Sequence, residues 1–311
     1  MVTLNTQENF LGLTPEWSRF DASQVVVLPI PYEHTTSYGH GAGKGPEAIL
    51  EASRQVELYD EELQTETFQR TGGIATIAPM DFDRIGKNAQ AVAAIRQQVK
   101  QLIDQRKFVV SLGGEHTIAV GAAQAYSEAF EDLSILQLDA HSDLRKEYEG
   151  NRYSHASVMA RIFEFHRDIV QVGIRSQCAE EAAFTKANHV RTFYAVELKR
   201  STSPWYDAVI ESLKPNVYVT FDCDFLDPSL MPALGTPEPG GFGWDETVAF
   251  LKRLSSQRRV VGLDVNELAP IPTLNHPQFT VAKLIYKWLG YILCIEGENG
   301  KTGKRDGSPF P

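Results

Sequence analysis

The sequence predicts an α/β protein in which helices cover both faces of a mostly parallel central sheet. Two observations lead to this fold class. Short runs rich in β-branched residues recur along the chain, as is typical of buried parallel strands. Segments with apolar residues at helical spacing alternate with these runs, which is the pattern of strand–helix–strand units.

Six runs are expected to form buried strands, at residues 25–30, 108–112, 135–138, 169–174, 217–221 and 260–265. Helices are expected at residues 88–106, 244–256 and 280–293. In the first of these helices, Val92, Ile95 and Val99 form one apolar stripe with polar residues opposite. Such helices would cover the two faces of the sheet.

The chain is expected to form a single domain. No internal repeat or low-complexity linker divides it, and the candidate metal-binding residues described below extend from 116 to 267. A domain boundary between them would divide the site. We therefore expect one domain over residues 1–311 with a core at about 20–295. The residues before this core and the tail from Lys301 to Pro311 are polar or rich in Pro and Gly, and we expect them at the surface.

The composition restricts the partners. The 311-residue chain carries 30 Lys and Arg against 40 Asp and Glu, a net charge of −10. This balance argues against a nucleic-acid partner and is compatible with a cationic substrate. The three cysteines are scattered, which favours a reducing compartment. No secretory signal is visible, and the apolar stretch 288–295 is too short to span a bilayer, so we expect a cytoplasmic protein without a membrane partner.

Alternating carboxylates follow two of the expected strands. Asp139, His141 and Asp143 come after the third run, and Asp222 and Asp224 come after the fifth. Acids at the end of a buried strand are unfavourable unless a cation is bound there. Alternate residues of an extended segment point the same way, so each set should share one face. The sequence therefore predicts a metal site, because oxygen and imidazole ligands suit divalent cations.

His116 adds a second imidazole. It follows the second run after Gly113 and Gly114, which would let the backbone turn sharply at the strand end. It would then lie at the carboxyl edge of the sheet, where open α/β sheets bind ligands. Two divalent cations would offset the charge of the four aspartates, whereas one would leave an excess, so a two-metal centre is favoured. Other interpretations of the single motifs stay open: a structural histidine at His116, a solvated turn or an acidic helix start at residues 139–143, and an Asx-turn at residues 222–224. For residues 139–143 the metal site is the favoured interpretation.

These motifs resemble those of the ureohydrolases, the arginase and agmatinase family. The resemblance covers about residues 20–295 in the family's order and is closest to the bacterial agmatinases. The matching segments are Gly113–His116, Asp139–Asp143, Ser154–Ser157, Phe221–Pro228 and Gly235–Gly241. The resemblance implies a three-layer α/β/α fold, two Mn²⁺ per subunit and a homo-oligomer, commonly a trimer or hexamer. The same ligand types would also accept iron, zinc, cobalt or nickel.

The resemblance also implies which residues bind the metals. One Mn²⁺ would be held by His116, Asp139, Asp143 and Asp222, and the other by Asp139, His141, Asp222 and Asp224. A hydroxide bridging the two ions would attack the guanidinium carbon of the substrate. The tetrahedral intermediate would then collapse to urea and an amine.

Three further residues take roles from the resemblance. His155 would be the general acid/base that protonates the leaving amine. Glu267 would accept two parallel N–H bonds from the substrate guanidinium, and Thr236 would hydrogen-bond near the reacting centre. The alternatives are that His155 is a loop histidine with no role and that Glu267 is an exposed acid at a strand end.

The loop of residues 144–153 bears on the substrate, and it resembles the corresponding loop of bacterial agmatinases. Glu147 and Glu149 would suit a distal ammonium group, so hydrolysis of agmatine to putrescine and urea is favoured. Arg145 and Arg152 would instead suit a carboxylate, or they would pair with those acids. Arginine and ω-guanidino acids such as guanidinobutyrate therefore stay open as substrates.

Two other classes of function stay open as well. One is a catalytically silent family member that binds metal, against which the complete ligand set argues. The other is a metal-dependent deacylase on a related fold, which gives no purpose to Glu267. The glycine-rich segment 35–46 lacks the spacing of a phosphate-binding loop and is expected to form a wall of the active site, with His40 as a peripheral polar residue.

Overall fold

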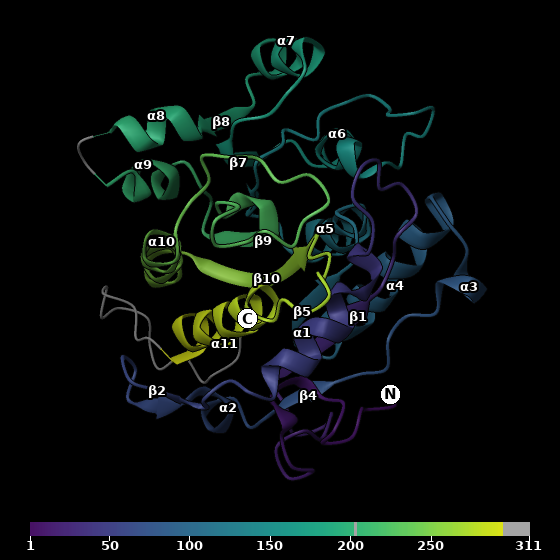
Figure 1. Ribbon diagram of the computed structural model, residues 1–311, viewed down its shortest axis with the longest axis vertical. Helices are drawn as coiled ribbons and strands as arrows, with labels where there is room; N and C mark the ends of the chain where they lie inside the picture. The colour runs from purple at the N-terminus through teal and green to yellow at the C-terminus, as the bar shows by residue number, and fades with distance from the viewer. Residues whose placement is uncertain (202–203, 295–311) are drawn as a thin grey trace.

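The computed structural model describes residues 1–201 and 204–294, and its centre is a parallel sheet (Figure 1). Within these ranges the sheet has eight strands in the order β4-β1-β5-β10-β9-β6-β7-β8. Every pair of neighbours is parallel. The strands are β1 Val25–Ile30, β4 Ile74–Thr76, β5 Phe108–Gly113, β6 Leu133–Leu138, β7 Ile169–Ile174, β8 Arg191–Tyr194, β9 Asn216–Asp222 and β10 Arg259–Asn266.

All six expected strands form, and the structure adds two. β4 has 3 residues and β8 has 4, and both lie at the edges of the sheet. Runs this short carry too few residues for a periodic pattern to be recognised. A small antiparallel hairpin, β2 Tyr59–Asp60 with β3 Thr65–Glu66, stands apart from the main sheet.

The three expected helices are confirmed as α4 Ala89–Asp104, α10 Trp244–Gln257 and α11 His276–Cys294. The sequence prediction did not name the others, which are α1 Gly45–Ser53, α2 Thr67–Arg70, α3 Phe82–Ile85, α5 Ile118–Ala129, α6 Val158–Phe165, α7 Ala179–Asn188, α8 Ala195–Arg200 and α9 Tyr206–Glu211. α5 shows why. It is rich in Ala and buried on almost every side, so it lacks the polar face that reveals an amphipathic helix.

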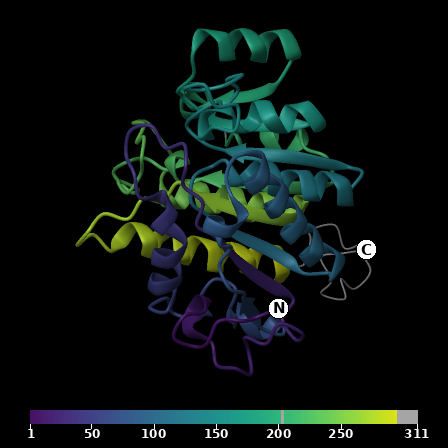
Figure 2. The ribbon, with the colours of Figure 1, turned by 90° about the vertical axis from the view of Figure 1, so that its right-hand side faces the viewer.

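The helices form one layer on each face of the sheet (Figures 1 and 2). All six residues of β1 are buried, and successive side chains of this strand point to opposite faces of the sheet. Val25 and Val27 pack in a cluster with residues of α1, α10 and α11. Val26 and Leu28 pack in a second cluster with residues of α4, α5 and α6. The predicted three-layer α/β/α fold is thus confirmed.

The expectation that the N-terminal residues lie loosely on the surface is wrong. Phe10, Leu11 and Leu13 are buried in the core, where they supply apolar area. The backbone is also tied down, because Leu4 N donates to Thr76 O at 2.8 Å and Phe10 N donates to the Thr76 hydroxyl at 2.9 Å. The expected polar tail, residues 301–311, lies outside the described residues.

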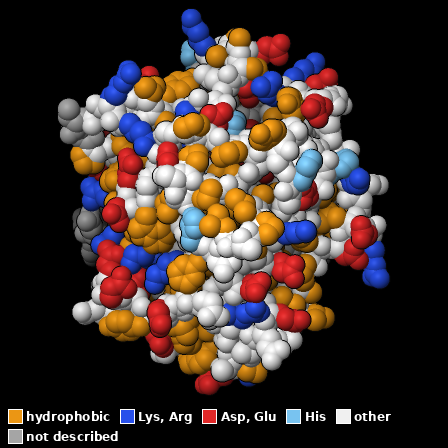
Figure 3. All heavy atoms as spheres, viewed as in Figure 1, with side chains coloured by type: hydrophobic (Ala, Val, Ile, Leu, Met, Phe, Trp, Pro, Cys, Tyr) orange, Lys and Arg blue, Asp and Glu red, His pale blue; other side chains and the backbone are white. Residues whose placement is uncertain are grey.

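The surface is mixed in charge. On the face drawn in Figure 3, acidic and basic side chains alternate around apolar and neutral ones. None of the helices in the described ranges is both long enough and apolar enough to cross a membrane.

The order of the central strands brings distant parts of the sequence together. The middle of the sheet has the order β5, β10, β9, β6. β6 is the next strand after β5 in the sequence, but β10 and β9 lie between them in the sheet. Parallel strands end at the same edge, so His116, Glu267, Asp222 and Asp139 follow four adjacent strands at that edge. Ligands of open α/β sheets bind where the strand order changes in this way.

Candidate metal centre

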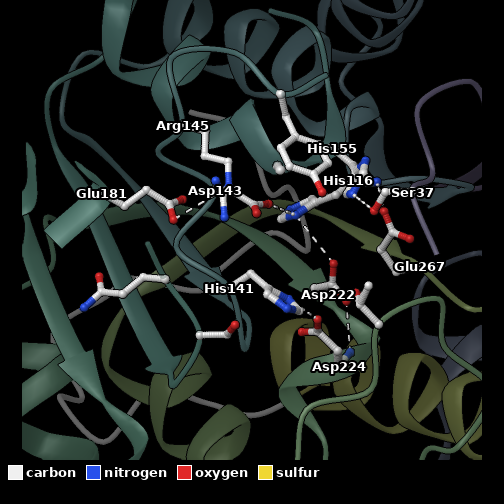
Figure 4. A pocket seen from close by; sticks show the side chains of 15 residues that line it. Ser37, His116, His141, Asp143, Arg145, His155, Glu181, Asp222, Asp224 and Glu267 are labelled. Carbon is white, nitrogen blue, oxygen red and sulfur yellow. Dashed lines mark hydrogen bonds and ion pairs between the residues drawn. The ribbon is translucent and has the colours of Figure 1, made fainter. Parts of the chain in front are cut away.

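His116 lies at the centre of one group of carboxylates (Figure 4). Its Nδ1 is 2.9 Å from Asp143 Oδ2, 3.2 Å from Asp139 Oδ2 and 3.5 Å from Asp222 Oδ2. All four residues are buried. Three carboxylate oxygens therefore converge on one imidazole nitrogen, and little of these four side chains is exposed.

His141 belongs to a second group beside the first. Its Nδ1 lies 2.7 Å from Asp224 Oδ2 and 3.8 Å from Asp139 Oδ1. Asp224 is buried, whereas the side chain of His141 is 27% exposed. Asp139 thus faces both imidazoles, with one oxygen toward each.

The acidic loops are turns and not extended segments, so the expected reason for the convergence is wrong, although Asp139, His141 and Asp143 do meet at one site. Asp139 Oδ1 accepts a hydrogen bond from His141 N at 2.6 Å, and Asp222 Oδ1 accepts one from Asp224 N at 2.9 Å. The second bond caps a short 3-10 helix, Cys223–Phe225, so the alternative of an Asx-turn describes this segment better. Asp143 has φ +53°, a left-handed conformation that Asp tolerates.

The two glycines before His116 serve a purpose other than the one predicted. Neither lies in the left-handed region that a sharp turn would require. A Cβ on Gly114 would stand 2.2 Å from Tyr32 O, and a Cβ on Gly113 would stand 1.9 Å from Asn266 Oδ1. Glycine is needed because neighbouring groups approach the backbone closely.

Burial and mutual repulsion govern the protonation of these acids. Desolvation, with the charges of Asp224 and Asp143, raises the pKa of Asp139 to about 7. Burial and the charges of Asp224 and Asp139 also raise the pKa of Asp222. Burial opposes ionisation of Asp224 too, but His141 outweighs it and the pKa of Asp224 falls to about 2. A cation among these oxygens would relieve their repulsion.

The donor atoms fit divalent cations. Two groups have ligand atoms that all lie within 4.8 Å of one another, namely His116, Asp139 and Asp222, and Asp139, His141 and Asp224. Asp139 belongs to both groups, as a bridging ligand would. Asp222 belongs to the first group alone, so its bridging role stays a prediction, as does direct ligation by Asp143. Imidazole and carboxylate donors suit Mn²⁺ among several divalent ions.

The metal ligands open onto a cavity of about 200 Å³. His155, Thr236 and Glu267, the three other residues predicted for the site, all line it. The structure therefore brings every predicted site residue to one place, either on the cavity wall or, for Asp139, directly beneath it. Burial raises the pKa of Glu267 to about 8, although the hydrogen bond from His116 N opposes this shift.

His155 lies on the cavity wall at the start of a short 3-10 helix, His155–Ser157. Its Nδ1 is 3.2 Å from the Thr35 hydroxyl and its Nε2 is 3.5 Å from the Ser37 hydroxyl. The ring also meets the Tyr148 ring in an edge arrangement, with 6.0 Å between centroids. The side-chain partners of this ring are hydroxyls and the Tyr148 ring, so its assignment as an acid/base and not a ligand stays a prediction.

The loop of residues 144–153 differs from expectation. Glu147 and Glu149 are exposed and are absent from the cavity lining, so they do not supply the predicted site for a distal ammonium. The arginines do not pair with them either. Arg152 forms a 2.8 Å ion pair with Glu164, away from the cavity.

Arg145 and Glu181 form the cavity wall instead (Figure 4). Arg145 Nε is 3.9 Å from Glu181 Oε2, and the Arg145 guanidinium lies 5.1 Å from the centre of the Tyr148 ring. Glu181 is held by backbone bonds from Leu144 N and Cys178 N, the second of which closes a capping box on α7. The sequence analysis missed Glu181. Its only local signal is its position three residues after the helix cap.

The glycine-rich segment 35–46 reaches the cavity through Ser37, which confirms its prediction as a wall. It is fixed there by a close approach of two backbones. Gly39 N donates to Gly235 O at 3.1 Å, and a Cβ on Gly39 would lie 2.8 Å from Gly235 atoms. His40 is mostly exposed and bonds to Thr36, as expected for a peripheral polar residue.

The fold and the site together define an α/β enzyme class with a metal-binding centre at the carboxyl edge of its sheet. Comparison with known proteins identifies the family. Residues 23–290 match the model of the Arginase family. The chain therefore belongs to the arginase family, and it is an agmatinase-like ureohydrolase.

Individual relatives support this assignment. The chain is 40% identical to the N(1)-aminopropylagmatine ureohydrolase of Synechocystis sp., over 86% of this chain and 88% of that protein. It is 31% identical to the agmatinase of Pyrococcus horikoshii, over 85% of this chain and 90% of that protein. The crystal structure of the agmatine ureohydrolase of Thermoplasma volcanium has a TM-score of 0.78 and 26% identity, and the match covers 94% of both chains.

Proposed function

We propose that this chain releases urea from a linear guanidine that carries a distal amine, with two Mn²⁺ bound by the His and Asp cluster. N1-aminopropylagmatine is the preferred substrate and agmatine, which gives putrescine, the second. The observation that carries the proposal is the single cavity onto which the metal-binding cluster, His155 and Glu267 all open. We further propose that the enzyme acts in the cytoplasm as a homo-oligomer, a trimer or hexamer as is common in the family.

Glu267 is suited to orient the guanidinium. It follows β10 at the cavity, and Oε1 accepts a hydrogen bond from His116 N at 2.6 Å, which fixes the carboxylate against the metal-binding group. A fixed carboxylate offers a planar guanidinium two parallel acceptors. The substrate carbon would thereby be held beside the His and Asp cluster, so that orientation contributes to the rate.

The bound metals would supply a water of lowered pKa as the nucleophile near neutral pH. His155 would donate a proton to the leaving nitrogen as the carbon–nitrogen bond breaks, and it would regain that proton from solvent. Proton donation turns the leaving group into a neutral amine, which departs more readily than an amide anion. Thr236, which also lines the cavity, would hydrogen-bond the reacting group.

Charge at the cavity wall bears on the choice of substrate. Among the described residues that line the cavity, Arg145 is the single Lys or Arg, and it lies beside Glu181. A substrate carboxylate would have to compete with Glu181 for Arg145. A substrate ammonium would instead gain from Glu181. Several relatives, including the Synechocystis protein, are named for N(1)-aminopropylagmatine, and others for agmatine.

Urea release with Mn²⁺ tests the proposal. We expect the highest kcat/KM on N1-aminopropylagmatine, a lower value on agmatine and little release from arginine or guanidinobutyrate. Release from arginine alone would overturn the substrate assignment. An absence of urea from every guanidine would overturn the hydrolase assignment and favour a silent metal-binding protein.

A matched pair of variants tests the wall. Arg145→Met keeps an unbranched side chain beside Tyr148 and removes the positive charge that lies over its ring, so it should raise kcat/KM for the polyamine substrates several-fold. Arg152→Met alters the same loop outside the cavity and serves as the control. If Arg145→Met abolished turnover of the amines and Arg152→Met did not, Arg145 would instead be a substrate ligand.

A further inference from the structure

We infer that Glu115 and Thr35 are positioning residues that fix the protonation geometry of His155. The inference rests on the proposed function, in which His155 donates a proton to the leaving amine. It assigns a purpose to two features that the site described so far leaves unused. One is the glutamate beside His116, and the other is the start of the glycine-rich segment 35–46.

Glu115 is fully buried and accepts four hydrogen bonds. Its Oε2 accepts from His34 N at 2.7 Å and from Thr35 N at 2.6 Å. Its Oε1 accepts from the Thr35 hydroxyl at 2.9 Å and from the Thr117 hydroxyl at 2.7 Å. Two of the four donors are backbone N–H groups, which can only donate, and the two carboxylate oxygens offer acceptor sites to all four. Glu115 thus fixes residues 34–35 beside the turn that follows β5 and carries His116.

The Thr35 hydroxyl has one proton, and the group that accepts this proton determines how the hydroxyl bonds to His155. This oxygen has three neighbours besides its own chain: Glu115 Oε1 at 2.9 Å, His155 N at 3.0 Å and His155 Nδ1 at 3.2 Å. The carboxylate can only accept, so the hydroxyl proton goes to Glu115. The backbone N–H of His155 can only donate. Only lone pairs of the hydroxyl oxygen are then left to face Nδ1 of His155. Nδ1 must therefore carry a proton and donate it to the hydroxyl oxygen.

Nδ1 of His155 therefore keeps its proton, and Nε2 becomes the nitrogen that gains and loses one. Nε2 lies on the side of Ser37, which together with His155 lines the cavity. A histidine locked in this tautomer presents its exchangeable proton to the cavity in each turnover. Without the lock, a fraction of the neutral rings would carry the proton on Nε2 and leave Nδ1, on the side of Thr35, as the nitrogen that exchanges a proton.

A series of variants isolates this role. Thr35→Val removes the nearer of the two hydroxyls beside Nδ1, the other being Ser154 Oγ at 3.4 Å. We expect kcat to fall about tenfold or more with KM and metal content near those of the parent. Thr35→Ser restores the hydroxyl and should restore kcat. Thr117→Val is the matched control, because it removes the other hydroxyl on Glu115 Oε1, a hydroxyl that also bonds Tyr153 O but does not contact His155. Its kcat should stay within about threefold of the parent.

Glu115→Gln changes the direction of the bonds with little change of shape. The NH2 group of Gln would donate to the Thr35 hydroxyl, where the carboxylate accepted from it. The hydroxyl proton would then point toward Nδ1 of His155, which favours the tautomer that carries its proton on Nε2. We expect loss of kcat with both metals retained. The double variant Thr35→Val/His155→Ala should be no slower than His155→Ala alone, because the effect of Thr35 passes through His155.

The outcomes separate the two hypotheses. If the parent enzyme releases no urea, the proposed function fails. If the parent is active and Thr35→Val retains its kcat, or if Thr35→Val slows His155→Ala further, the positioning role is wrong while the function stands. A rise in KM or a loss of metal without a fall in kcat would show Thr35 to be a loop contact only, and this too would overturn the inference.

Discussion

Glu267 Oε1 accepts a hydrogen bond from the backbone N–H of His116 at 2.6 Å, although 151 residues separate them in sequence. The contact joins the carboxylate proposed for the guanidinium to the backbone of a metal-binding histidine. Glu267 also has φ +66°, which is rare for a residue with a long side chain. A strained backbone at such a point is typical of a functional site.

Glu267→Gln should keep both metals and lose substrate orientation. The amide oxygen can still accept from His116 N, but the negative charge that faces the guanidinium is lost. We expect kcat/KM to fall about 100-fold or more, because a charged hydrogen bond contributes roughly 1.5–3 kcal/mol and two are affected. Steady-state kinetics with metal analysis checks this.

Glu238→Gln is the control, since that carboxylate lies near the site, 4.0 Å from His141 Nε2, and is given no role. It should retain most of the activity. Equal losses in the two variants would show that negative charge in general, and not Glu267, recruits the substrate.

Asp139→Ala should lose both ions, because Asp139 belongs to both groups of ligand atoms. Asp224→Ala alters only the second group, so it should lose mainly the ion that the second group binds and retain the ion of the first group. Metal content per subunit after dialysis, measured by atomic emission, distinguishes them, and a thermal melt shows that the variants fold. Two ions at full occupancy in Asp139→Ala would contradict its bridging role.

His155→Ala should keep its metals and lose mainly turnover. General acid–base catalysis contributes about 10²–10⁴-fold to rate, so kcat should fall within that range while KM changes little. His166→Ala removes a histidine that bonds Ser127 and Leu133 O outside the cavity and gives the comparison. An unchanged kcat in His155→Ala would remove His155 from the mechanism.

Lys287→Met should destabilise the fold far more than Lys252→Met. Both lysines pair with Glu62, but Lys287 is 8% exposed and also contacts Asp60 at 3.0 Å, while the Lys252 side chain is 48% exposed. Loss of one partner from a buried pair costs about 3–5 kcal/mol, against about 0–1 kcal/mol for an exposed pair. Urea denaturation measures both, and equal midpoints would contradict the difference.

The same cluster predicts a dependence on pH. Burial opposes the charge on Glu62, but Lys252, Tyr291 and Lys287 outweigh it and lower its pKa to about 2. A lowered folded-state pKa contributes stability above the ordinary pKa of glutamate, near 4.5, that is lost as the pH falls toward 2. The destabilisation caused by Glu62→Gln should therefore shrink between pH 5 and about 2. A constant difference over this range would contradict the assignment.

Much of the fold could be predicted from the sequence, because the central strands are long enough to show a pattern. The run at 25–30 is apolar throughout and the runs at 169–174 and 217–221 are mostly apolar, as is expected of strands covered on both faces. α5 could not be found by amphipathic spacing, since the protein covers it on almost every side. β4 and β8 were too short, and their pairing depends on strands that lie far away in sequence.

The ligand types at the metal centre were also visible in the sequence, because acids at the ends of apolar runs are unusual enough to need an explanation. The geometry that brings these ligands together was not visible. They do not converge because alternate residues of an extended strand share a face. The loops after β6 and β9 turn instead, and the side chains of Asp139 and Asp222 stabilise the turns by accepting hydrogen bonds from the backbone two residues further on.

By itself, the sequence determined the class of the sheet, the six candidate ligands and the resemblance that names His155, Glu267 and Thr236. Local pattern can carry this much, because strand composition and motif order are properties of neighbouring residues. Only the tertiary structure decided that Glu181 and Arg145, and not Glu147, form the cavity wall, and that Glu115 reaches His155 through Thr35. These contacts join residues 36 to 120 positions apart, and they depend on the order of the strands, which no local pattern encodes.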